Sequence, residues 1–202
     1  MKGAKKPTLW LIAGPNGVGK TTYAYRQVRQ ISGSVHFVNL DEIARGLSPL
    51  DAEVARDAAA RVALRRIRDF ITAKQSFSLE TTLAGRTHLR TIRGATRAGF
   101  EVRLLLFFVA TVDVCLTRVA RRVVEGGHNV PEIDVRRRFQ RSIANFPEYA
   151  KIVDHWTVLD NTKAAPVTAA EGRKGCLMVE REVTNLPRAL VKAVRALPAC
   201  AE

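Results

Sequence analysis

The sequence predicts a three-layer α/β/α fold around a mostly parallel five-stranded sheet, because short apolar segments alternate with longer amphipathic ones along its 202 residues. The segment Leu104–Val109 is apolar throughout, which is typical of a strand buried on both faces of a parallel sheet. A chain of this length suits one compact core. We therefore expect residues 1–202 to form a single α/β domain.

The expected elements follow one another along the chain. The expected strands are Leu9–Ala13, Val35–Val38, Phe77–Thr82, Glu101–Ala110 and Trp156–Leu159. The expected helices are Lys20–Gln30, Asp51–Lys74, Thr87–Ala98, Asp113–Val124 and Pro131–Asn145, and the last two form a helical lid of about residues 113–146. The C-terminal extension, about residues 163–202, is expected to hold a small hairpin, Val167–Ala170 with Cys176–Glu182, and a closing helix, Leu186–Leu197.

A glycine-rich loop directly follows the first expected strand and opens the first expected helix. It reads Gly14, Pro15, Asn16, Gly17, Val18, Gly19, Lys20, Thr21 and Thr22, which is the pattern of a phosphate-binding loop, or P-loop, with its strand and helix in place. Such a loop turns backbone N–H groups around a phosphate chain. Lys20 is expected to reach the β- and γ-phosphates and Thr21 to help hold Mg²⁺. The sequence therefore predicts a P-loop NTPase fold that binds ATP with Mg²⁺.

Carboxylates follow two other expected strands, where the polar groups of a parallel sheet converge. Asp41 follows the second strand and is our candidate for the general base that takes the proton of an acceptor hydroxyl. An alternative is that Asp41 only caps a helix beginning near Glu42. Glu80, with Thr82 beside it, is a candidate for binding the substrate or a water on Mg²⁺. Its alternative is a surface ion pair with Arg86 or Arg90.

Arginines gather on the two helices of the expected lid. Such a lid could bring guanidinium groups onto the triphosphate, although charged helix faces are usually only solvated. His128 lies in the turn between the helices, and we expect it to contact substrate rather than a metal. The candidates for phosphate contact are Arg118, Arg122, Arg136 and Arg137.

Composition narrows the function classes. The net charge of +14 favours anionic partners, and the few aromatic residues do not interleave with basic ones as in a base-stacking surface. Cys115, Cys176 and Cys200 are widely spaced and suggest neither a disulfide framework nor a zinc site, so we expect three reduced cysteines. No apolar run approaches the roughly 20 residues that cross a bilayer. We therefore expect a cytoplasmic protein with no membrane partner.

Taken together, several motifs resemble the zeta toxin-like branch of P-loop kinases over roughly residues 9–161. They are the P-loop, the segment Phe37–Asp41, the segment Ser76–Leu83, the Gly126–Glu132 segment with its Gly-Gly-His, and the arginine run Arg136–Ser142. The resemblance implies an ATP-dependent kinase whose best-known members phosphorylate a hydroxyl of UDP-N-acetylglucosamine.

The same resemblance implies roles for individual residues. The catalytic base of the family matches Asp41, and its substrate-contacting Glu-x-Thr step matches Glu80 and Thr82. The family's next arginine falls at Ala84 here, and Arg86 is the candidate to replace it. The lid arginines that hold ATP match Arg122 and one of Arg136 or Arg137. Toxins of this family pair with an antitoxin, but this shorter chain is similar to the stand-alone relatives, so we do not assume such a partner.

The leading interpretation is a small-molecule kinase that uses ATP and a phosphorylated acceptor such as a nucleotide sugar. Two alternatives stay open. The charge would also suit a polynucleotide 5′-hydroxyl kinase, whose binding would weaken with salt. A nucleotide-binding interaction module without catalysis is the third possibility.

Overall fold

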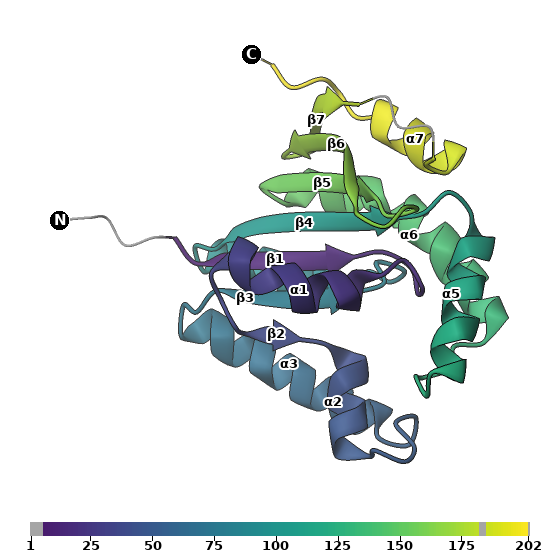
Figure 1. Cartoon of the computed structure of the whole chain (residues 1–202). Coiled ribbons are helices and arrows are strands. Elements are labelled where there is room, and N and C mark those ends of the chain that lie inside the picture. The colour runs from purple at the N-terminus through teal and green to yellow at the C-terminus, as the bar shows by residue number, and fades with distance from the viewer. Residues whose placement is uncertain (1–5, 182–184, 202) are drawn as a thin grey trace.

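The computed structural model describes residues 6–181 and 185–201, without the side chains of residues 28, 29, 31 and 32, and contains one sheet between two layers of helices (Figure 1). The strands are β1 (Thr8–Ala13), β2 (Phe37–Val38), β3 (Phe77–Thr81), β4 (Glu101–Phe108), β5 (His155–Asp160), β6 (Val167–Arg173) and β7 (Cys176–Glu180). The helices are α1 (Lys20–Ser32), α2 (Leu40–Leu47), α3 (Arg56–Thr72), α4 (Thr87–Arg97), α5 (Val112–Val124), α6 (Glu132–Ile152) and α7 (Arg188–Arg195). The expected three-layer α/β/α fold is confirmed.

The sheet has seven strands rather than the expected five, in the order β2-β3-β1-β4-β5-β6-β7. The first five are parallel, and the hairpin β6–β7 extends the same sheet by antiparallel pairing with β5. A glycine allows this close approach, because a Cβ at Gly172 would lie 2.2 Å from the ring of Trp156. The expected hairpin end at residue 182 lies outside the described residues.

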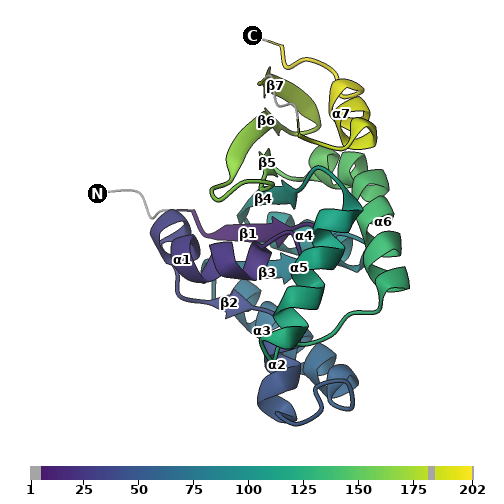
Figure 2. The same cartoon turned by 45° about the vertical axis from the view of Figure 1, so that its right-hand side comes forward.

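Right-handed crossovers distribute the helices over the two faces of the sheet. From β1 the chain moves to the edge strand β2, and from β2 it moves back across the sheet through β3, β4 and β5. Helix α1, on the first of these connections, covers one face, and α3, α4 and α6, on the later ones, cover the other (Figure 2). On that second face α3 contacts α4, α4 contacts α6, and α6 contacts α7. The carboxyl ends of the parallel strands therefore meet at one open edge, beside α5.

Helix boundaries differ from expectation in two places that affect the site. Residues 40–47 form a separate helix, α2, and α3 begins only at Arg56, whereas the sequence suggested one helix from Asp51. Helix α6 continues to Ile152, well beyond Asn145, and contains Pro147. Its buried residues Phe139, Phe146 and Tyr149 pack into the core and stabilise this longer helix.

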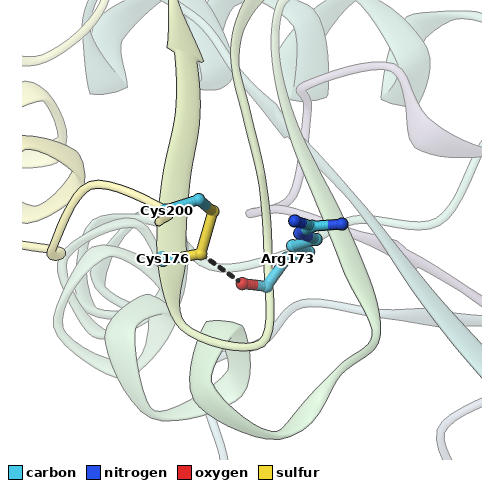
Figure 3. Close-up of a disulfide and its surroundings, with 3 residues drawn as sticks. All are labelled: Arg173, Cys176 and Cys200. Carbon is cyan, nitrogen blue, oxygen red and sulfur yellow. Dashed lines mark hydrogen bonds between the residues drawn. A yellow bond between two sulfur atoms is a disulfide. The ribbon is translucent and has the colours of Figure 1, made fainter. Parts of the chain in front are cut away.

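The expectation of three reduced cysteines is wrong for two of them. Cys176 at the start of β7 forms a disulfide with Cys200, which lies beyond α7 (Figure 3). The sulfur of Cys176 also lies 3.0 Å from the carbonyl oxygen of Arg173. The wide spacing of the two cysteines gave no sign of the pair in the sequence. They meet because β7 lies beside the C-terminal segment, where Leu177 pairs with Ala199. Cys115 is free, as expected, and it is buried.

Candidate active site

The conformation of the P-loop depends on its glycines. Gly14, Gly17 and Gly19 have φ values of 138°, 82° and 90°, which residues with a Cβ rarely adopt. A Cβ at these positions would lie within 2.2 Å of the Phe107 carbonyl, 2.4 Å of the Cys115 carbonyl and 2.6 Å of Asn161 Nδ2, respectively. The loop is therefore a narrow backbone cradle, which fits a phosphate chain.

Glu80 lies at the centre of a buried polar network beside this cradle. Both of its carboxylate oxygens accept from the Thr21 hydroxyl, at 2.9 and 3.0 Å, and Oε2 also accepts from Asn39 Nδ2 at 2.9 Å. Lys20 Nζ lies 3.9 Å from Oε1 and donates to the Pro15 carbonyl. Glu80 is thus bonded to the P-loop, and the alternative of a surface pair with Arg86 or Arg90 is wrong.

Burial acts in opposite directions on the two charges of this network. It raises the pKa of Glu80 above its usual range, while the ammonium of Lys20 opposes that change. Burial also lowers the pKa of Lys20, opposed chiefly by the Glu80 carboxylate and then by Asp41. Burial thus disfavours the charged form of both side chains, and each is stabilised in its charged form by the other. A bound phosphate with Mg²⁺ would add an anion beside Lys20 and a cation beside Glu80.

Asp41 shares the cavity with this network but is held differently. Asn39, not Asp41, is the N-cap of α2, because Asn39 Oδ1 accepts from the backbone N–H of Asp41 at 2.9 Å and of Glu42 at 3.1 Å. The alternative that Asp41 serves as the cap is therefore wrong. Its side chain is exposed in the first turn of α2 and lines the cavity with Lys20 and Glu80.

The cavity has a volume of about 920 Å³ and extends from the P-loop along α5. One wall is the segment after β5, where Asn161 Nδ2 donates to the Val18 carbonyl of the P-loop at 2.6 Å. Arg118 fastens this segment to α5 by donating to the carbonyls of Asn161 and Thr162, both at 3.0 Å. A nucleotide is of the right size for this space.

Two of the four expected lid arginines face the cavity and two do not. Arg118 and Arg122 line it. Arg136 instead pairs with Glu132 and Asp113, and Arg137 pairs with Asp134, on the exposed side of α6. Neither Arg136 nor Arg137, the two candidates on α6, therefore lines the cavity.

Arg138 is the α6 arginine that reaches the P-loop. Its Nη1 donates to Asn16 Oδ1 at 3.0 Å, and its side chain is only 17% exposed. Burial lowers its pKa, opposed by Asp134. Arg138 belongs to the arginine run of the expected lid, but the sequence did not single it out, because three consecutive arginines look alike until the buried residues Val135 and Phe139 fix the rotation of the helix.

The turn between α5 and α6 holds Arg122 in place. Arg122 Nη2 donates to the His128 carbonyl at 2.7 Å, and a Cβ at Gly127 would lie 2.4 Å from Arg122 Cγ. His128 thus meets Arg122 through its backbone. Arg122 Nε is buried and has no hydrogen-bond partner among the described residues. An unpartnered buried donor at the cavity wall fits an anionic ligand such as a nucleotide phosphate.

The loop after β3 is held from outside by α6. Leu83 has φ 58°, a left-handed conformation that costs an L-residue about 1–3 kcal/mol and persists only where the surrounding structure imposes it. Side chains of α6 donate to three carbonyls of this loop, and the Ser142 hydroxyl also donates to the carbonyl of Arg138 in its own helix. The bonds are Ser142 Oγ to Thr82, Asn145 Nδ2 to Leu83 and Tyr149 Oη to Gly85.

The side chains expected to contact substrate on this loop point in different directions. The Thr82 hydroxyl accepts from the backbone N–H of Ala84. Arg86, which is 70% exposed, forms an ion pair with Glu148 of α6 at 2.8 Å. Strand β3 therefore places Glu80 in the cavity, whereas the loop after it turns Arg86 toward α6.

The described residues contain no group of three or more His, Cys, Asp or Glu side chains that could hold a metal ion by themselves. The Thr21 hydroxyl and the Glu80 carboxylate are nevertheless the hard oxygen donors that Mg²⁺ uses together with phosphates. None of the helices in the described part of the chain is long and apolar enough to span a bilayer.

Asn39 and Asn161 are two further residues of the candidate site that the sequence did not single out, and Asn161 lines the cavity. Asn39 caps α2 and holds Glu80 at the same time, whereas Asn161 joins the segment after β5 to the P-loop. The signal available in sequence was their position, since each follows a strand at the edge where ligands bind.

Comparison with known proteins finds relatives both by sequence and by structure. A Haemophilus influenzae protein described as uncharacterized is 30% identical over 126 residues, which is 62% of this chain and 88% of that protein. A structure from the PezAT toxin–antitoxin system of Streptococcus pneumoniae has a TM-score of 0.66 and 17% identity, covering 83% of this chain and 72% of that one. The AvrRxo1-ORF1:-ORF2 complex with ATP has a TM-score of 0.69 and 16% identity, covering 96% and 64%.

At these identities the two structures show a shared fold, and that fold is the zeta toxin-like one expected from the motifs. The family model that matches the sequence is described as an AAA domain and covers residues 9–146, from β1 through the P-loop to α6. Because this match spans more than half of the chain, the protein belongs to this AAA domain family and contains a P-loop kinase-like domain.

Proposed function

We propose that the protein is an ATP-dependent kinase that transfers the γ-phosphate to a hydroxyl of a nucleotide sugar similar to UDP-N-acetylglucosamine, or of a related phosphorylated metabolite. The observation that carries the proposal is the pair of carboxylates beside the P-loop. Glu80 is buried against Lys20 and Thr21, and Asp41 lies exposed in the same cavity. A protein that only senses a nucleotide has no need of a second carboxylate beside an acceptor position.

The proposed mechanism uses the P-loop for the donor and Asp41 for the acceptor. The P-loop backbone and Lys20 bind the β- and γ-phosphates of ATP. The Asp41 carboxylate takes the proton of the substrate hydroxyl while the oxygen of that hydroxyl forms a bond to the γ-phosphorus. The bond from that phosphorus to the β–γ bridging oxygen breaks, and ADP leaves. Mg²⁺, held by Thr21 with Glu80 close by, would supply positive charge to the phosphates.

The guanidinium groups of this mechanism come from both lid helices. Arg118 and Arg122 line the cavity from α5. From α6 we assign Arg138 in place of Arg136 or Arg137, because Arg138 already contacts the P-loop through Asn16. Guanidinium groups aimed at the transferred phosphate stabilise charge that develops in the transition state.

The test is an ATP-consumption screen of the purified protein against nucleotide sugars, simple sugars, nucleosides and oligonucleotides with 5′-hydroxyl ends. Mass spectrometry of each reaction then identifies the phosphorylated compound. A product of UDP-N-acetylglucosamine or another nucleotide sugar supports the proposal. Labelling of oligonucleotide ends alone would replace the acceptor class, and slow ATP hydrolysis with every compound would favour a nucleotide-binding module.

A further inference from the structure

Helices α3 and α4 carry a set of arginines that differs from those of the lid. Their sequences contain eight arginines and two aspartates, Asp57 and Asp69. Arg56, at the start of α3, pairs with Glu53 one turn away, as Arg121, Arg136 and Arg137 of α5 and α6 each do with an acidic residue. The proposed kinase site gives no reason for so much unneutralised charge elsewhere.

Six of these arginines point away from the sheet. The buried sides of the two helices are formed by Ala59, Ala63 and Ile67 on α3 and by Leu89 and Ile92 on α4. On each helix three outward arginines are separated by three or four residues, so they lie in one row along the helix, which we call a stripe. They are Arg61, Arg65 and Arg68 on α3 and Arg90, Arg93 and Arg97 on α4, and all six are exposed.

We call the two stripes together the α3–α4 basic face. Helices α3 and α4 contact each other on the same face of the sheet (Figure 2). None of the six arginines forms a hydrogen bond or ion pair with a described residue, and none lines the nucleotide cavity. Unpaired like charges on neighbouring helices repel one another, and a bound polyanion would remove this repulsion by neutralising them.

We propose that the α3–α4 basic face binds the phosphate backbone of double-stranded nucleic acid without reading its sequence. Each stripe spans about 10 Å, because seven residues of helix rise by about 1.5 Å each. About 10 Å of duplex carries about six phosphate charges, the same order as the six guanidinium groups. The planar guanidinium group also bonds phosphate oxygens in pairs.

Other polyanions fit this face less well. None of the exposed residues of α3 and α4 is aromatic, so a single strand would gain no base stacking. The buried side of α3 is turned into the core, and the large apolar side chains that α3 exposes are Val62 and Leu64 alone, too few for the apolar face of a helix that lies in a lipid surface. The inference is independent of the kinase proposal, because it concerns a surface outside the cavity.

The experiment measures fluorescence anisotropy of labelled 20-base-pair duplex DNA and RNA between 50 and 200 mM KCl. We expect wild-type affinity to fall about 10³-fold over this range if six phosphates are contacted. Replacing all six arginines by glutamine should weaken binding at 50 mM at least about 10-fold and flatten the salt dependence. The half-variants Arg61→Gln/Arg65→Gln/Arg68→Gln and Arg90→Gln/Arg93→Gln/Arg97→Gln should each give part of the loss.

The matched control removes the same charge from exposed positions elsewhere: Lys151, Arg173, Lys174, Arg181, Arg188 and Lys192, all to Gln. It should change duplex affinity less than about 3-fold, whereas a loss equal to that of the six-arginine variant would overturn the proposal. Absence of duplex binding by the wild type at 50 mM would also overturn it. So would tighter binding to phosphatidylserine vesicles or polyglutamate than to duplex, which would assign the face to lipid or to an acidic protein.

Discussion

Glu80 and Asp41 line the same cavity in opposite settings. Glu80 is buried, and it is bonded to Thr21 and Asn39 within a network that includes Lys20. Asp41 is exposed at the start of α2, and the nearby loop after β3 is held by side chains of α6 rather than by the P-loop. Glu80 is therefore held by side chains from the P-loop and from the start of α2, whereas the loop after β3 depends on a helix more than 50 residues further along the chain.

This difference suggests how the site works as a unit. Helix α6 contacts the P-loop through Arg138 and the loop after β3 through Asn145 and Tyr149. These two attachments fix the loop after β3 relative to the P-loop, which matters for the proposed kinase because phosphoryl transfer relies on positioning. We therefore expect mutations along α6 to separate into donor effects and acceptor effects.

The largest of these effects is expected at the donor end of α6. Arg138→Ala should lower the rate of phosphate transfer about 10²-fold, because it removes a guanidinium at the P-loop. Arg137→Ala is the matched control, since Arg137 is half exposed and pairs with Asp134. Initial rates with the acceptor found by the screen provide the measurement. Equal losses in the two variants would contradict the rotation of α6 and its assignment of Arg138.

A smaller donor effect is expected at the turn that positions Arg122. Gly127→Ala places a Cβ against Arg122 Cγ and its carbonyl oxygen, at 2.4 and 2.9 Å. Such overpacking costs about 1–3 kcal/mol, and we expect about a 10-fold rise in the Kd of a fluorescent ATP analogue. Gly94→Ala is the control, because a Cβ there meets open space on a helix. Unchanged affinity in Gly127→Ala would mean that Arg122 does not hold the nucleotide.

The acceptor effect should be smaller still and should leave the donor untouched. Tyr149→Phe and Asn145→Ala each remove one hydrogen bond to the loop after β3, worth about 1 kcal/mol. We expect kcat/KM for the acceptor to fall about 5-fold while the KM for ATP stays constant. Faster hydrogen exchange of the amides of residues 82–86 should accompany the loss. A variant at the exposed Gln140 should show neither change.

The smallest effect on activity is expected from the disulfide, which lies outside the cavity. Thiol titration of the denatured, unreduced protein should find one cysteine, Cys115, and three after reduction. In the folded, unreduced protein Cys115 should not react, because burial raises its pKa to about 12. Opening a link across 24 residues should cost about 3 kcal/mol of stability, measured by thermal unfolding with and without reductant. Three reactive thiols without reductant would rule out the pair.

The sequence predicted the parts of the molecule that depend on neighbouring residues. The P-loop and the alternation of strands and helices follow from local patterns, and the structure contains them with shifted boundaries. Sequence patterns could not predict the rotation of Arg138, the attachment of Asn145 to Leu83 or the pairing of Cys176 with Cys200. Each of these requires knowing which distant segments lie side by side, and only the packed core determines that.

The most direct test of the account is the variant Asp41→Asn, assayed for both nucleotide binding and phosphate transfer. The exchange keeps the shape of the side chain and removes its capacity to accept a proton. We expect the rate of transfer to fall about 10²–10⁴-fold, as loss of a general base requires, while the Kd of a fluorescent ATP analogue stays within about 2-fold. Glu42→Gln, on the next residue of α2, should transfer phosphate normally. Full turnover by Asp41→Asn would contradict the central claim that this cavity is built to phosphorylate a hydroxyl.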